Sequence, residues 1–174
     1  MDITQLILDD HQEQRRLFAI LEQVDRDDHE SLSAIWTRLS RFLDLHADAE
    51  EALFYPALLH LGKGTGGKHT PEEETEDAIH DHNDIRDAVA AVGTRQVGSD
   101  EWYEAVAAAN VANGDHMAEE EREGLTDFRR HASLETRHRL GVAFAAFETT
   151  HASTASTLDR DPEEYVDEHL RSGD

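Results

Sequence analysis

One pattern of histidine and glutamate occurs twice in this chain, in the same order and at nearly the same intervals. Its members are three residues in each half of the chain: His11, His46 and Glu50, and then His82, His116 and Glu120. The interval from His46 to His116 is 70 positions, and that from Glu50 to Glu120 is the same. A spacing that is kept across two halves indicates a duplicated structural unit, here a pair of helical hairpins.

Apolar residues recur at intervals of three and four around this pattern, which predicts amphipathic helices. His46 stands where the periodicity calls for leucine, and Glu50 follows one turn later on the same face. We expect helices over residues 3–25, from Ser31 to Gly62, from Thr70 through Val92, from Ser99 through Phe128, and over residues 134–158 and 162–170. The expected N-terminal caps are Ser31, Thr70, Ser99, Ser133 and Asp161, and Gly62 is the expected C-terminal cap.

These elements predict an all-α fold, an up-down four-helix bundle with additional C-terminal helices. Residues 1–131 form the expected bundle, and residues 132–174 form a helical extension. The extension has apolar residues that we expect to pack on the bundle or against a second copy, as in a homodimer: Leu134, Leu140, Val142, Phe144, Ala145 and Phe147.

The residue types of the repeated pattern suit a metal site. Two residues four apart on a helix lie on one face, so His46 with Glu50, and His116 with Glu120, can serve the same ions. Neutral imidazole with carboxylate suits iron, manganese or zinc, and one carboxylate can bridge two ions. A lone histidine in an apolar stripe is more often a hydrogen-bonded core residue, but six inward residues in duplicate register favour a two-metal site. The chain has no cysteine, which excludes thiolate ligands and disulfides.

Charge narrows the possible partners. The chain has 39 acidic and 16 basic residues, a formal charge of −23, which repels nucleic acid and anionic lipid. No apolar run approaches the ~18–20 residues that span a membrane, and no basic signal-like start is present. We therefore expect a cytoplasmic protein with neither nucleic acid nor membrane as a partner. The acidic, lysine-poor balance suits a high-salt cytoplasm, although a GC-rich genome would also favour arginine over lysine.

Over about residues 5–130 the chain resembles the hemerythrin-like, HHE cation-binding family of di-iron four-helix bundles. The resemblance implies a non-haem centre of two iron ions joined by an oxo or hydroxo bridge. It also implies that Glu50 and Glu120 bridge the two ions. The four histidines of the pattern would then be terminal ligands.

Two departures from the oxygen-carrying hemerythrins bear on function. Those proteins have H-x-x-x-H on the third helix, whereas the residue four before His82 is Ala78. They also place aspartate five residues after the fourth-helix histidine, where this chain has Glu121. The loss of one histidine would open a coordination position on one iron. An open position favours reaction with peroxide, nitric oxide or oxygen over simple reversible oxygen carriage.

Three further residues are secondary candidates for the site. His80 is the rival of His82, but helical phase places His82 inward and His80 outward. Tyr55 could supply a phenolate to the open position, or it could be a packing residue before Pro56. Glu121 lies beside the expected bridging carboxylate.

Other polar residues recur without an assigned ligand role. Arg15 and Arg86 follow a histidine of the pattern by four residues, and could be outer partners of the bridging carboxylates or solvated surface residues. Glu148 with His151 resembles half of a ferritin-like motif, and so does Glu135 with His138. Both pairs fall on one helix, whereas that architecture needs two, so we expect surface positions.

Two classes of function remain. The first is a stress-defence protein whose di-iron centre binds or reacts with small oxidants or diatomic gases, and which can be an oxidoreductase of a peroxidase-like or nitric-oxide-consuming kind. The second is an oxygen or redox sensor, or an oxygen- or iron-binding module without turnover. The open coordination position favours the first class. The sequence leaves open the physiological ligand and the redox partner.

Overall fold

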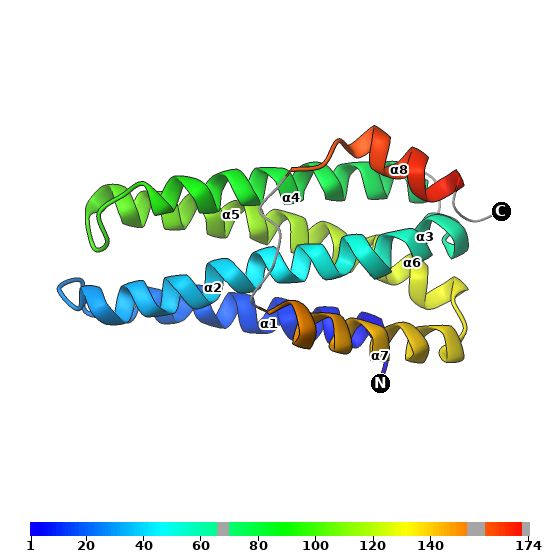
Figure 1. The fold of residues 1–174 in the computed structure, drawn as a ribbon, viewed down its shortest axis with the longest axis horizontal. Coiled ribbons are helices and arrows are strands. Elements are labelled where there is room, and N and C mark those ends of the chain that lie inside the picture. The colour runs from blue at the N-terminus through cyan, green and yellow to red at the C-terminus, as the bar shows by residue number, and fades with distance from the viewer. Residues whose placement is uncertain (66–69, 153–158, 172–174) are drawn as a thin grey trace.

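Four long helices form two antiparallel hairpins that lie side by side in the computed structural model (Figure 1). The first hairpin joins α1 (Ile3–Leu21) to α2 (His29–Ala49), and the second joins α4 (Pro71–Gly93) to α5 (Asp100–Arg122). The structure describes residues 1–65, 70–152 and 159–171, and these contain no β-strand. The predicted all-α, up-down bundle is confirmed.

In each half of the chain, a long helix is interrupted at or just after two consecutive glutamates, Glu50 and Glu51 in the first half and Glu120 and Glu121 in the second. α2 passes into a π-helical segment, η1 (Glu50–Phe54), and then into α3 (Tyr55–Leu61). α5 ends at Arg122 and is followed by α6 (Gly124–His131), so the single helix expected through Phe128 is interrupted. Gly124 and Phe128 are nevertheless buried, which explains why apolar periodicity alone gave no sign of the break.

The π-helical turn exposes a carbonyl group to a distant partner. The N–H of Tyr55 donates to the carbonyl of Glu50, five residues back. Pro56 has no N–H with which to continue this ladder, so the carbonyl of Glu51 is available. The hydroxyl of Tyr165 donates to that carbonyl. A single π-helical turn of this kind is frequent at functional sites.

Most predicted helix caps are confirmed. Thr70 and Glu73 form a reciprocal capping box, and the Ser99 and Ser133 side chains each accept a bond from the third residue beyond them. The expectation for Ser31 was wrong, because Asp28 caps α2 and accepts from the Ser31 N–H. The first helix is also shorter than predicted: it ends at Leu21, before the aspartate-rich turn.

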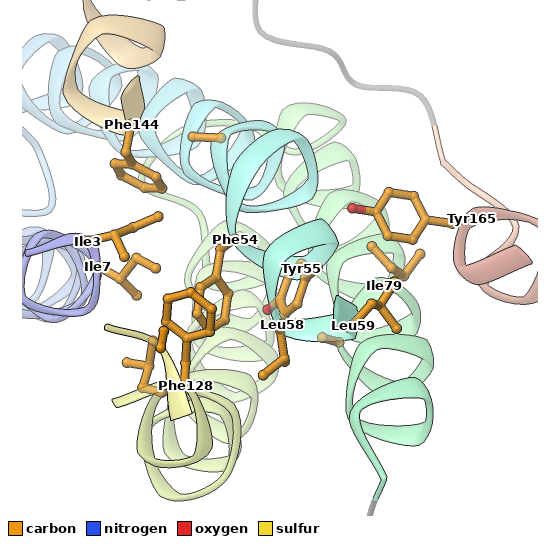
Figure 2. Packing of buried hydrophobic residues seen from close by; sticks show 14 of the residues in the cluster. Ile3, Ile7, Phe54, Tyr55, Leu58, Leu59, Ile79, Phe128, Phe144 and Tyr165 are labelled. Atoms are coloured by element: carbon orange, nitrogen blue, oxygen red, sulfur yellow. The ribbon is translucent and has the colours of Figure 1, made fainter. Parts of the chain in front are cut away.

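Two apolar clusters fill the bundle, one toward each end. One contains Ile7, Phe54, Leu58 and Phe128, whose side chains converge in Figure 2. The other contains Leu17, Leu39 and Trp102. The sequence places polar residues on every long helix between these clusters, and a buried polar layer separates them.

The C-terminal helices pack on the bundle. α7 (Leu134–His151) contacts α1 and α2, and α8 (Pro162–Arg171) contacts α3 and α4 (Figure 1). Residues 153–158 of the helix predicted over 134–158 lie outside the described residues.

Only part of the apolar surface of α7 faces the bundle. Phe144 is buried, and Leu140 and Phe147 pack against the first cluster. Leu134 and Val142 are 74% and 50% exposed, so these two residues do not pack on the bundle, and their packing against a second copy is untested. A homodimer through this surface stays a prediction. No helix of the described ranges combines the length and apolarity needed to cross a membrane.

Candidate metal centre

The buried polar layer consists of the six residues of the repeated pattern. Each is at most 5% exposed, and they are His11, His46, Glu50, His82, His116 and Glu120. Helical spacing turns each residue inward, and the apolar clusters lie on both sides of the layer. The structure therefore brings together all six predicted site residues.

Glu50 lies at the middle of this group. Its Oε1 is 3.0 Å from Nε2 of His46, and its Oε2 is 3.3 Å from Nε2 of His82. The Nε2 atoms of His82 and His116 are 3.1 Å apart. One carboxylate thus faces histidines from both halves of the chain.

Two sets of donor atoms are compact enough to hold an ion each. His11, His46 and Glu50 form one set, and Glu50, His82 and His116 form the other; within each, the donors lie within 4.8 Å of one another. Glu50 belongs to both sets, as a bridging carboxylate would. Glu120 belongs to neither, although its Oε2 is 3.3 Å from Nε2 of His11.

Orphaned polar atoms at the centre fit a metal pair. Five buried atoms of the six site residues have no hydrogen-bond partner among the described residues: Nε2 of His11, Nε2 of His46, both carboxylate oxygens of Glu50, and Oε2 of Glu120. The short distances among them do not have hydrogen-bond geometry. Each unpaired buried polar group costs on the order of 1–3 kcal/mol, and a bound ion removes that cost. These are the atoms that metal coordination would use.

Each of the four histidines also has a carboxylate at its other ring nitrogen. The Nδ1 partners are Glu121 for His11 (3.0 Å), Glu51 for His82 (2.9 Å), Asp10 for His46 (3.2 Å) and Asp81 for His116 (3.4 Å). A proton on Nδ1 that donates to the carboxylate leaves the Nε2 lone pair free to face the centre. The ring orientations therefore suit ligation through Nε2.

Two of these outer carboxylates link the halves of the chain. Glu121 also accepts from Arg15 at 2.9 Å, and Glu51 from Arg86 at 2.8 Å. The hydrogen bond from His11, followed by the charge of Arg15, lowers the pKa of Glu121 to about 2. Glu121, a secondary ligand candidate, thus lies on the outer side of His11. Both arginines thus pair with the neighbours of the expected bridging carboxylates rather than with those carboxylates themselves; Arg15 is exposed and Arg86 is buried.

The other two secondary candidates, His80 and Tyr55, differ in burial. His80 is exposed and His82 is buried, as helical phase predicted. Tyr55 is buried and donates from its hydroxyl to Oε1 of Glu120 at 2.7 Å. Burial, followed by the charges of Glu120 and Glu50, raises the pKa of Tyr55 well above its usual value. In the metal-free chain its hydroxyl is therefore a neutral hydrogen-bond donor, and its role as a phenolate ligand stays a prediction.

The carboxylates at the outer nitrogens of the histidines could be predicted from the sequence only in part. An aspartate directly precedes both His11 and His82, and a second glutamate follows both Glu50 and Glu120, so a repeated signal was present. Glu148 had no such signal, and its expected surface position was wrong. It is half-buried on α7, in a possible ion-binding group with Asp10 and His46.

The charges in the layer act on one another. Burial opposes protonation of His82, but the nearby carboxylates of Glu50 and Glu51 outweigh that effect and raise the pKa of His82 to about 9. Burial likewise opposes ionisation of Glu50, yet the charge of His46, followed by that of His82, holds the pKa of Glu50 well below its usual value. In the absence of metal, these pKa values favour a protonated imidazole beside an ionised carboxylate.

Comparison with known proteins bears on the family and the fold of the chain. A family model described as the hemerythrin HHE cation binding domain matches residues 2–138. The crystal structure of a hemerythrin HHE cation-binding domain-containing protein, the Rv2633c homologue from Mycobacterium kansasii, is similar with a TM-score of 0.74. It is 17% identical in sequence, and the alignment covers 98% of this chain and 99% of that one. A search of curated proteins finds no significant match. Since the family model spans most of its length, the chain belongs to the hemerythrin HHE cation-binding domain family.

Proposed function

We propose that this protein holds two iron ions in the polar layer and uses them to bind or react with small oxidants or diatomic gases. His11 and His46 would serve one ion, His82 and His116 the other, and Glu50 would bridge them, with Glu120 as the second predicted bridge. The observation that carries the proposal is the set of five orphaned donor atoms facing a common centre. Iron in this position would supply electrons by changing between the ferrous and ferric states.

A small pocket beside the layer supports reaction with a small molecule. Its walls include Ala78 and Gly124, and His116 and Glu120 lie along it. Ala78 is the position at which oxygen carriers have a further histidine, so the missing side chain and the pocket coincide. The volume in which the centre of a water-sized molecule fits is about 20 Å³. This is enough room for one molecule of water or of a diatomic gas.

The chemistry of the walls favours an uncharged reactant. Six carboxylates line the pocket, and the described residues along it include no lysine or arginine. Such a field disfavours anions, whereas hydrogen peroxide, nitric oxide and oxygen are neutral. Tyr55 also lines the pocket, and its single hydroxyl hydrogen is used in the bond to Oε1 of Glu120.

A sensor without turnover is the second candidate, because the C-terminal helix contacts the outer partner of a predicted ligand. Arg160 pairs with the carboxylate of Glu51, and Tyr165 donates to the carbonyl of Glu51. Glu51 in turn holds Nδ1 of His82. A change at the centre can therefore reach α8. Steady-state consumption of peroxide by the iron-loaded protein supports the first candidate; binding of one equivalent of gas without turnover supports the second.

Substitution of Ala78 by histidine tests the role of the pocket. The imidazole would fill the space beside His116 and supply an additional nitrogen, so we expect peroxide consumption to fall by at least ~10-fold, about 1.4 kcal/mol of barrier. Iron content should remain at two per chain. Ala90→His, on the exposed face of the same helix, is the matched control. Unchanged consumption in Ala78→His would show that reactants reach the iron by another route.

A further inference from the structure

The pocket beside the metal layer has more carboxylates than the entry of a small neutral reactant would need. It lies between α4 on one side and α5, Gly124 and α3 on the other. Its carboxylates are Glu74, Asp77, Asp81, Glu119, Glu120 and Glu123. Asp77 is exposed, Glu119 and Glu123 are half-buried, and Glu120 is buried, so the carboxylates extend from solvent to the predicted metal ligands.

Glu74 is the unusual member of this set. It is 9% exposed, and neither of its carboxylate oxygens has a hydrogen-bond partner among the described residues. Unlike Glu50, Glu74 forms no ion pair with a histidine or arginine among the described residues. A buried carboxylate that lacks both a partner and water is costly unless it binds a proton or a cation.

The neighbours of Glu74 add to this cost. Asp127 and Glu123 lie close enough for their charges to act on it. The carboxylate of Asp127 already has partners: it accepts hydrogen bonds from the backbone N–H groups of Lys63 and Gly64, and it contacts His131. Burial, followed by these two charges, raises the pKa of Glu74 to about 7. At neutral pH only part of the Glu74 carboxyl groups therefore carry a proton, and the ionised groups are available to a cation.

We propose that this pocket is a transit site for a divalent cation, with Glu74 as its inner ligand, through which metal ions reach the centre. The donors are carboxylate oxygens, which divalent cations accept readily even before they lose all their water. The half-buried carboxylates at the outer end attract the cation, Glu74 holds it, and His116 and Glu120 receive it. This inference rests on the proposed metal centre, to which the route leads.

Uptake kinetics of Co²⁺ by the metal-free full-length chain test the proposal. Co²⁺ bound by imidazole and carboxylate absorbs visible light, so stopped-flow absorbance reports arrival at the centre, and equilibrium dialysis reports the final content. Glu74→Gln keeps the size of the side chain and imitates its protonated form. We expect it to take up Co²⁺ at least ~10-fold more slowly than the unaltered chain, with the same final content of two ions.

Two further variants sharpen the comparison. Glu104→Gln removes the same charge from an exposed position on α5, 16 residues before Glu120, and should load at the unaltered rate. Glu119→Gln, at the outer end of the pocket, should load more slowly than Glu104→Gln but faster than Glu74→Gln. If Glu74→Gln fails to fold, equal uptake rates for Glu119→Gln and Glu104→Gln would overturn the transit site.

The outcomes are distinct. Uptake by Glu74→Gln at the unaltered rate would overturn the transit site, and Glu74 would then be a protonated core carboxyl. Loss of bound Co²⁺ from this variant at equilibrium would also overturn it, because Glu74 would be part of the centre itself. Failure of the unaltered chain to bind two ions would instead overturn the proposed function.

Discussion

Replacement of Glu50 by alanine is expected to release metal from both positions of the centre at once. Glu50 is the residue shared by the two donor sets, and its two oxygens face His46 and His82 respectively. Loss of an outer partner commonly weakens a metal site by roughly 10–100-fold, so loss of a shared ligand should weaken each position by more. Iron per chain, measured after gel filtration, should fall from two to a small fraction of one.

Matched variants identify the cause of that loss. Glu104→Ala removes an exposed glutamate of α5 and should keep both ions. Glu120→Ala should lose less metal than Glu50→Ala, because Glu120 belongs to neither compact donor set. Retention of two iron ions by Glu50→Ala would contradict the shared-ligand arrangement. Circular dichroism should show that all three variants are helical.

The metal-free protein is expected to lose stability as pH rises from 6.5 to about 9. The pKa of His82 is raised from 6.5 to about 9 in the folded chain. A raised pKa contributes stability that is fully present below 6.5 and is lost as pH rises through the folded value. At 1.36 kcal/mol per pKa unit, the loss from His82 alone is about 3 kcal/mol. Urea unfolding of chelator-treated protein across this range measures it.

Two comparisons check the sign of this pH effect. The pKa of Glu50 is lowered, so its contribution is present above its usual value of 4.5 and is lost only as pH falls through the folded value. Metal-loaded protein should behave differently, because bound ions need neutral imidazole and bind more tightly as protons leave. The gap in unfolding free energy between the loaded and metal-free forms should therefore widen from pH 6.5 to 9. A gap that narrows would contradict the assignment of these histidines as ligands.

The residues of the metal centre could be predicted from the sequence because the pattern that marks them is local to each helix and occurs twice. His46 and Glu50 lie one helical turn apart in the apolar stripe of their helix, so both are predicted to point inward. His116 and Glu120 repeat this spacing in the second half of the chain and support the same prediction. The same reasoning separated His82 from His80. Helical periodicity thus gave both the fold class and the inward face of each helix.

Contacts between the halves were beyond such reasoning. Glu121 lies 110 positions from His11 in sequence, and whether it faces the metal or the outer nitrogen depends on how the two hairpins pack. Glu148 reaches Asp10 and His46 only because α7 docks on the first hairpin. The π-helical turn at Glu50–Phe54 shifts the helical phase by one residue, so that Phe54 and Leu58 are buried beyond it, and the regular spacing of apolar residues gave no sign of this shift.

Iron analysis combined with a low-temperature Mössbauer spectrum of the oxidised protein tests the central claim most directly. Two ferric ions bridged by Glu50 and an oxo or hydroxo group would be strongly spin-coupled. We therefore expect two iron ions per chain and a quadrupole doublet without magnetic splitting at liquid-helium temperature. One iron per chain, or the magnetic pattern of isolated high-spin ferric ions, would contradict a bridged pair at this centre.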